Sequence, residues 1–141
     1  MNRRVLLDTG PLVAAWDRRD EHHEWAKLQW RQAAPPFLTC EPVITEALFL
    51  LRAKASGGTD EVMELLRRGV VEVAFHLEDH VEPLAQLLRK YASVPMSLAD
   101  ACLVRMAELS AESMILTLDH DFRLYRKSGR HVVPVIMPEG F

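Results

Sequence analysis

The chain has 141 residues, of which 49% are hydrophobic and 26% are charged, a composition typical of a globular protein. That length fits a single domain over residues 1–141 with one well-developed core. The net charge of −3 excludes a generally basic nucleic-acid-binding protein, although a local basic face is compatible with it. No apolar run approaches the roughly eighteen residues of a membrane span and no signal peptide opens the sequence, so we expect a soluble cytoplasmic protein.

The first predicted element is a short apolar run, residues 5–7, which ends at Asp8. Large apolar residues without alternation are typical of a strand buried on both faces of a parallel sheet. In open α/β sheets ligands bind outside the carboxyl ends of the strands, which is where Asp8 would lie. Asp8 is also a good N-cap for a helix over residues 11–16 that begins with Pro11, so a purely structural role stays open.

Two helices and a strand are predicted next. A moderately amphipathic helix over residues 21–33 ends at Pro35 and Pro36, and a short strand covers residues 37–40. A helix over residues 42–54 follows, with apolar residues at helical spacing that define a core face. Glu46 lies one position from that face among apolar neighbours, where a carboxylate needs a partner unless it sits on the surface flank of the helix.

The middle of the chain alternates in the same way. We expect a turn at residues 56–58, a helix from Thr59, a strand over residues 70–75 and a helix over residues 76–91. The next helix, residues 97–109, begins with Ser97 followed three positions later by Asp100, which approximates a capping box. Capping would account for Asp100, but its small and apolar neighbours are unusual around an exposed acid.

The last third completes the predicted sheet. An apolar strand over residues 113–118 ends at Asp119 and Asp121, a basic segment covers residues 123–130, and a final strand covers residues 131–136. Strands that alternate with helices imply a mainly parallel sheet of about five strands covered by helices on both faces. We therefore predict an α/β fold, a three-layer α/β/α sandwich.

Four acids converge in this arrangement. Asp8 and Asp119 end two strands, while Glu46 and Asp100 lie in early turns of helices that start at the same edge of the sheet. Grouped carboxylates repel each other, so they either share protons or bind divalent cations. Oxygen ligands without histidine or thiolate suit Mg²⁺ or Mn²⁺, and these ions bind phosphate oxygens, so a phosphate ester is the expected substrate. The two cysteines, Cys40 and Cys102, lack metal-type spacing and are expected to be buried free thiols.

Four segments together resemble the PIN domain family, particularly the VapC-type ribonuclease toxins. They are Val5-Leu6-Leu7-Asp8-Thr9-Gly10-Pro11-Leu12, Thr45-Glu46, Ser97-Leu98-Ala99-Asp100-Ala101 and Leu116-Thr117-Leu118-Asp119-His120-Asp121-Phe122. The resemblance covers essentially the whole chain. It implies a Mg²⁺- or Mn²⁺-dependent endoribonuclease that hydrolyses RNA phosphodiester bonds. It also implies the toxin of a type II toxin–antitoxin pair, a homodimer silenced by a cognate antitoxin that fills the acidic cleft.

The same resemblance assigns residue roles. Asp8 and Asp100 would be the principal metal ligands, and Glu46 would complete the site or orient the attacking water. Asp119 would bind the metal directly or through water, with Asp121 as the competing choice for the fourth acid. Thr9 would hold Asp8 or a bound water, and Ser97 and Thr117 would support the acids.

RNA binding beside an acidic site requires positive charge elsewhere. The candidates for contact with RNA flank the two acid-bearing strand ends: Arg18, Arg19, His22, His23, Arg123, Arg126 and Lys127. Such residues more often form a solvated face. Two other functions are compatible with the acids, a receiver-like Mg²⁺-binding regulatory domain and a catalytically silent interaction domain. A receiver would need an aspartate at the end of a middle strand, where this chain has His76.

Overall fold

A five-stranded parallel sheet forms the centre of the computed structural model, which describes residues 3–54 and 57–141. The strands run in the order β3-β2-β1-β4-β7, and the four neighbouring pairs are parallel. Their bounds are β1 (Arg4–Leu7), β2 (Phe37–Thr39), β3 (Val71–Val73), β4 (Ser113–Leu116) and β7 (Val135–Ile136). The predicted α/β fold with a mainly parallel sheet is confirmed. Ser56, expected in a turn, lies outside the described residues.

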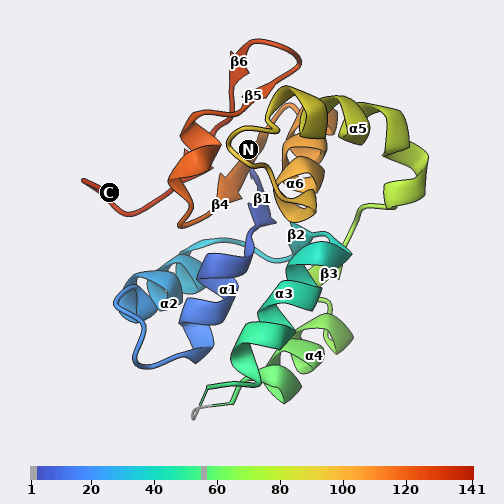
Figure 1. Cartoon of the computed structure of the whole chain (residues 1–141). Coiled ribbons are helices and arrows are strands. Elements are labelled where there is room, and N and C mark those ends of the chain that lie inside the picture. The colour runs from blue at the N-terminus through green and yellow to red at the C-terminus, as the bar shows by residue number, and fades with distance from the viewer. Residues whose placement is uncertain (1–2, 55–56) are drawn as a thin grey trace.

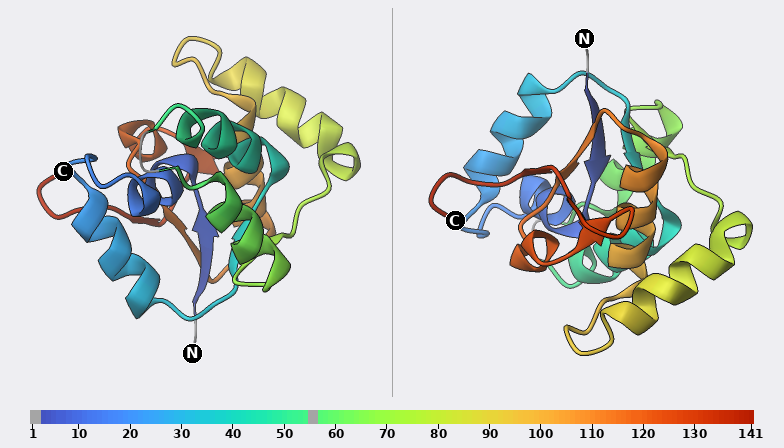
Figure 2. Two further views of the ribbon diagram at one scale, coloured as in Figure 1. Left: turned by 90° about the horizontal axis from the view of Figure 1, so that it is seen from below. Right: turned by 90° about the horizontal axis from the view of Figure 1, so that it is seen from above.

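Helices connect these strands. They are α1 (Thr9–Trp16), α2 (His23–Gln32), α3 (Glu41–Leu51), α4 (Thr59–Arg67), α5 (Val81–Lys90), α6 (Leu98–Leu109) and the short 3₁₀ helices η1 (Leu77–His80) and η2 (His120–Arg123). The chain moves from β1 through β2 to β3 in one direction and then crosses back to β4. Because such crossovers are right-handed, the two sets of helices cover opposite faces of the sheet. Figure 2 shows α2 and α6 on either side of β1.

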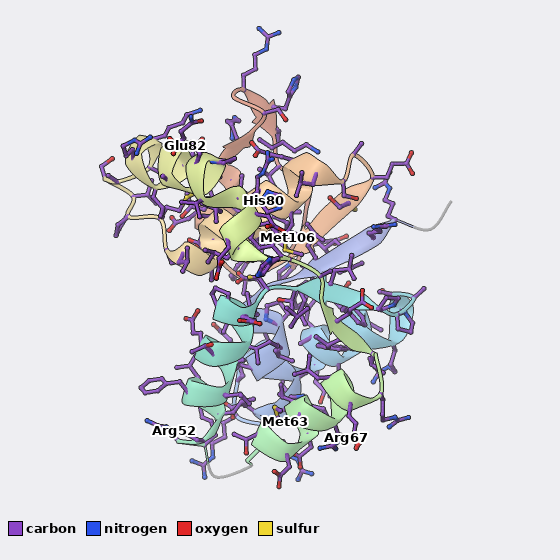
Figure 3. The ribbon with its side chains drawn as sticks, turned by 90° about the vertical axis from the view of Figure 1, so that its right-hand side faces the viewer. Arg52, Met63, Arg67, His80, Glu82 and Met106 are labelled. Atoms are coloured by element: carbon purple, nitrogen blue, oxygen red, sulfur yellow. The ribbon has the colours of Figure 1, made fainter. Side chains whose placement is uncertain are left out.

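The sheet holds the core together through β1, its central strand. Leu6 and Leu7 are fully buried, and β1 pairs with β2 on one side and β4 on the other. Figure 1 shows α1 beginning where β1 ends, with α6 beside β1. Helix α6 is buried along most of its length, since eight of its twelve residues are buried. In Figure 3, Met106 lies in the part of the molecule formed by α5 and α6, whereas Met63 lies at the far end with α3 and α4.

The helix expected over residues 76–91 is divided. Residues Leu77–His80 form η1 and residues Val81–Lys90 form α5, with Pro83 in the first turn of α5. Proline has no N–H to donate to the carbonyl four residues earlier, so an α-helical ladder cannot run through it, whereas a first turn accepts it. Most other predicted elements are present with shifted ends; for example, the helix expected from residue 21 begins at His23.

The final strand, expected over residues 131–136, is also divided. His131–Val132 is β6, which pairs antiparallel with β5 (Arg126–Lys127) in a separate two-stranded sheet, and only Val135–Ile136 (β7) joins the main sheet. Pro134 stands between them and lacks the N–H that a continuous ladder would need. Residues 126–132, which include most of the predicted basic segment, thus form a β-hairpin that turns at Ser128 (φ 49°) and Gly129 (φ 88°).

None of the helices in the described ranges combines the length and hydropathy needed to cross a bilayer.

Candidate active site

The candidate site lies at the carboxyl ends of β1 and β4, which are neighbours in the sheet with Leu7 opposite Leu116. From β1 the chain continues toward β2, and from β4 it continues toward β7 on the other side. This reversal makes the gap between the two strand ends the topological switch point, where ligands of α/β sheets bind. Asp8 follows β1 directly, and its backbone N–H donates to the carbonyl of Leu116 at 3.0 Å.

Asp8 is buried and held by two hydrogen bonds. Its Oδ1 accepts the backbone N–H of Thr9 at 2.8 Å, and its Oδ2 accepts the hydroxyl of Thr117 at 2.6 Å. The first bond makes Asp8 the N-cap of α1. Asp8 therefore caps α1 and also lies at the switch point, so the two interpretations of its sequence position are compatible.

Thr117 joins the ends of the two strands. While its hydroxyl donates to Asp8, the same oxygen accepts the backbone N–H of Asp119 at 3.0 Å. The carboxylate of Asp119 in turn accepts the N–H of Asp121 at 2.9 Å and caps η2. Thr117 is fully buried. Its hydroxyl thus fixes the path of the chain that carries Asp119.

Gly10 allows the first turn of α1 to approach this segment closely. A Cβ atom at Gly10 would lie 3.2 Å from the Cβ of Leu118, which is closer than most real contacts of this type. A side chain at this position would crowd Leu118, so Leu118 or the first turn of α1 would have to shift slightly. The glycine at position 10, two residues after Asp8, therefore helps to keep the two acid-bearing ends together.

Asp100 lies in the first turn of α6 and is 8% exposed. Its backbone N–H donates to the hydroxyl oxygen of Ser97 at 3.0 Å, so Ser97 is the N-cap, as the sequence predicts. The Oδ2 atom of Asp100 accepts the phenolic hydroxyl of Tyr125 at 2.8 Å. Burial and the neighbouring Asp100 carboxylate raise the pKa of Tyr125 above its ordinary value, so this hydroxyl stays protonated and donates.

Tyr125 is a site residue that sequence reasoning missed. It is fully buried, three residues after the buried Phe122. Nothing in the local sequence indicates that a tyrosine at this position faces Asp100.

Glu46, on α3, is exposed but connected to the site. Its Oε2 accepts the hydroxyl of Thr9 at 3.1 Å. Thr9 therefore links two acids, since its backbone N–H binds Asp8 and its hydroxyl binds Glu46.

The carboxylates of the site influence each other electrostatically. Burial raises the pKa of Asp8 from 3.8 to about 7, the hydrogen bonds from Thr117 and Thr9 oppose this rise, and the charges of Asp100 and Asp119 add to it. Burial also raises the pKa of Asp100, and the charge of Asp119 contributes. Ionising all three carboxylates together therefore requires compensation by positive charge.

The residues present fit a hydrated Mg²⁺ or Mn²⁺ ion. In the ranges 3–54 and 57–141, no three His, Cys, Asp or Glu side chains are arranged to hold an ion by themselves. Mg²⁺ does not require such an enclosure, because it keeps several waters and is bound through one or two carboxylates together with substrate phosphates. Asp8, Asp100 and Asp119 provide the hard oxygen ligands that these ions prefer.

The basic and histidine candidates are more dispersed than the acids. Arg18, Arg19 and Arg123 are exposed. The guanidinium of Arg126 donates to the carbonyls of residues 123, 124 and 125, so it stabilises the chain after η2. Lys127 lies on β5 and is half-buried.

The two histidines near the start of α2 already have partners within the chain. His23 Nδ1 lies 2.7 Å from the carbonyl of Ala14, and the ring of His22 packs edge-on against Phe141 with centroids 4.9 Å apart. His22 is half-buried. His23 therefore contacts α1, whereas His22 packs against the last residue of the chain.

Comparison with known proteins agrees with the fold. No curated protein sequence matches the chain significantly. A solved structure, VapC20 of Mycobacterium tuberculosis, described as a sarcin-ricin loop cleaving toxin, is similar with a TM-score of 0.74 and 22% sequence identity, over 92% of this chain and 98% of that chain. At this identity the likeness concerns the fold. The family model of the PIN domain matches residues 5–128, a stretch that includes every acid of the candidate site. The chain therefore belongs to the PIN domain family.

Proposed function

We propose that this protein is a Mg²⁺- or Mn²⁺-dependent endoribonuclease of the VapC toxin type. The observation that carries the proposal is the position of Asp8, Asp100 and Asp119 around the switch point. Burial raises the pKa of Asp8 and of Asp100, the charges of Asp100 and Asp119 add to the rise at Asp8, and the charge of Asp119 adds to the rise at Asp100. Membership of the PIN domain family and the fold likeness to VapC20 support it. The substrate class follows from the expected ion, because Mg²⁺ and Mn²⁺ prefer phosphate oxygens.

Each acid has a distinct role in this proposal. Asp8 and Asp100 are the principal ligands, and Asp119 binds directly or through water. When bound, the ion supplies Lewis acidity and lowers the pKa of a coordinated water. The hydroxyl of Thr117 and the N–H of Thr9 hold the Asp8 carboxylate in one orientation.

Glu46 is the proposed group that orients the attacking water and accepts its proton. It is exposed, as a residue that meets water and substrate must be, and Thr9 holds one of its oxygens. The remaining oxygen is available to a water molecule. A general base needs both a fixed position and contact with the water that it deprotonates.

RNA binding is proposed for three exposed arginines. Arg18 and Arg19 follow α1, and Arg123 ends η2. These side chains could neutralise phosphates on either side of the cleaved bond, which would make binding weaken as salt concentration rises.

We also propose a cognate antitoxin partner, a homodimer and a cytoplasmic location, as the VapC-type likeness suggests. Exposed apolar side chains on α3 and α4 support a protein contact: Phe49, Leu50 and Met63 are all more than a third exposed. Sedimentation of the purified chain at several concentrations would test the dimer.

The function is tested by RNA cleavage with purified protein. The substrates are a hairpin with the sarcin-ricin loop sequence, chosen because VapC20 is described as cleaving that loop, together with an unstructured RNA and a single-stranded DNA. Each is incubated with Mn²⁺ or Mg²⁺, with and without EDTA. We expect RNA cleavage that EDTA abolishes and that Asp8→Asn and Asp100→Asn reduce by at least about a hundredfold.

The matched control is Asp60→Asn, which makes the same chemical change in the exposed first turn of α4, away from the candidate site. This variant should cleave like the wild type. Cleavage that persists in Asp8→Asn, or that EDTA does not affect, would contradict the proposal. No cleavage of any RNA by a folded, metal-loaded protein would favour a catalytically silent interaction domain.

A further inference from the structure

Tyr125, the residue before the hairpin of β5 and β6, contacts Asp100 of the candidate site. The Tyr125 hydroxyl donates to Asp100 Oδ2 at 2.8 Å, and this bond is buried. Tyr125 is fully buried, whereas Asp100 retains 8% exposure, so the carboxylate lies between the core and the open side of the site. We infer that Tyr125 is a positioning residue that holds the Asp100 carboxylate in the orientation in which it binds a divalent cation. The inference rests on the proposed function.

The ring of Tyr125 is itself held on two sides. Tyr91, at the end of α5, packs edge-on against it with centroids 5.0 Å apart, and Phe122 of η2 does so at 5.2 Å. The backbone next to Tyr125 is also fixed, because the N–H of Arg126 donates to the Tyr91 hydroxyl at 2.8 Å. The phenolic oxygen therefore has little freedom to move away from Asp100.

The hairpin that follows Tyr125 is attached to both helices behind the site. Lys90 of α5 donates from Nζ to the carbonyl of Gly129 at 2.9 Å, and Glu108 of α6 accepts the N–H of Ser128 at 2.7 Å. Helix α6 also carries Asp100. The segment that carries Tyr125 and the helix that carries its acceptor are therefore bonded to each other at a second point. The hairpin thus determines where the hydroxyl lies relative to the carboxylate.

Core packing alone does not require a hydroxyl at this position. A phenylalanine would fill the same space beside Tyr91 and Phe122, whereas a buried phenol must find a hydrogen-bond partner. Here that partner is an acid of the candidate metal site. Hydrogen bonds to metal-ligating carboxylates set their orientation, and loss of such a partner typically weakens metal binding about 10–100-fold. Mg²⁺ demands near-ideal octahedral geometry, so it is sensitive to a ligand that can rotate.

The test compares Tyr125→Phe with Tyr91→Phe by direct titration with Mn²⁺ in calorimetry, without RNA. Both variants lose a tyrosine hydroxyl from the same aromatic cluster, but only Tyr125 bonds to Asp100. We expect Tyr125→Phe to weaken Mn²⁺ binding about tenfold or more. Tyr91→Phe removes the bond to the Arg126 N–H but leaves the Tyr125 hydroxyl on Asp100, so it should weaken Mn²⁺ binding clearly less than Tyr125→Phe does. Thermal unfolding without metal records the structural effect of each change separately.

A second measurement uses the wild-type protein, so it does not depend on the folding of a variant. The chain has two tyrosines, and ¹³C labelling of their hydroxyl-bearing carbons therefore gives two NMR signals. Addition of Mg²⁺ should shift the signal of Tyr125 more than that of Tyr91. Equal Mn²⁺ affinity in wild type and Tyr125→Phe, or a Tyr125 signal that Mg²⁺ leaves unchanged, overturns the inference. Metal-dependent RNA cleavage by the wild type together with equal Mn²⁺ affinity in wild type and Tyr125→Phe overturns the inference and leaves the proposed nuclease standing.

Discussion

The Thr117 hydroxyl lies 2.6 Å from Asp8 Oδ2 and also accepts the N–H of Asp119, so one buried side chain connects acids that are far apart in the sequence. The two acids follow neighbouring strands, β1 and β4. The hydrogen bond helps the buried Asp8 to ionise, because the hydroxyl stabilises the charged carboxylate. Both the stability of the strand ends and the charge state of the site depend on this contact.

Replacing Thr117 by valine removes the hydroxyl while keeping the shape. We expect a loss of about 1–3 kcal/mol in the free energy of unfolding, measured with urea, because a buried carboxylate loses its partner. We also expect a fall in RNA cleavage. The control is Thr39→Val, which removes another buried hydroxyl that donates to the carbonyl of Leu7 at 2.7 Å. It should cost about 1 kcal/mol and leave cleavage unchanged. Equal cleavage by the two variants would count against the assigned role of Thr117.

The metal-free protein should lose stability as pH rises from about 4 to about 7. Burial, together with the charges of Asp100 and Asp119, raises the pKa of Asp8 from 3.8 to about 7 in the folded state. Within this window the folded state keeps a proton that the unfolded chain releases, so rising pH favours unfolding. Above about pH 7 both states are ionised at this position and the effect levels off.

Asp8→Asn removes this titrating group and identifies its contribution. Urea unfolding of the metal-free variant should show a weaker decline between about pH 4 and 7, and at about pH 8 the variant should exceed the wild type by roughly 1–3 kcal/mol. The wild type should recover stability when Mg²⁺ is added at high pH, and the variant should recover less. Identical pH profiles for the two proteins would show that Asp8 ionises as freely as an exposed acid.

Asp119 should matter more than Asp121. The charge of Asp119 raises the pKa of both Asp8 and Asp100, so Asp119 lies close to both carboxylates. The charge of Asp121 instead contributes to the raised pKa of Tyr125, and its backbone N–H donates to Asp119. We expect Asp119→Asn to lower the cleavage rate by about a hundredfold and Asp121→Asn by about tenfold or less. Rate measurements at saturating Mn²⁺ would decide between them, and a larger loss in Asp121→Asn would reverse the assignment.

The two cysteines should be inert in the native protein. Cys40 and Cys102 are both free and buried, as the sequence predicts. Both side chains are 0% exposed, so a reagent reaches neither thiol in the folded state, and a buried thiol is unreactive. A thiol-reactive dye should therefore label the native protein at least about a hundredfold more slowly than the urea-unfolded chain. Rapid native labelling would indicate that α3 and α6 separate readily.

The sequence predicted the strands that carry acids because burial on both faces leaves a clear mark. β1 is an uninterrupted apolar run, and the polar residue that ends it is at once the end of the strand and a member of the site. β4 ends at Leu116, two residues earlier than expected, because Thr117 belongs to the site's hydrogen bonds although it remains fully buried.

The hairpin and its tyrosine were not predicted, for a different reason. β5 and β6 have two residues each and pair with one another, so each is too short to show the alternation of apolar and polar residues that marks a strand. The Ser128-Gly129 turn was a usable signal, since this dipeptide often marks a turn, but the partners of the hairpin lie on α5 and α6. The contact of Tyr125 with Asp100 depends on that tertiary packing, which no local pattern contains.

A crystal structure of the protein with bound Mn²⁺ would show whether Asp8, Asp100 and Asp119 form a metal site, because Mn²⁺ is located by its anomalous scattering. The account predicts an ion coordinated by carboxylate oxygens of Asp8 and Asp100, with Asp119 bound directly or through a water. An ion bound at another part of the surface, with Asp8 still hydrogen-bonded only to Thr9 and Thr117, would contradict it.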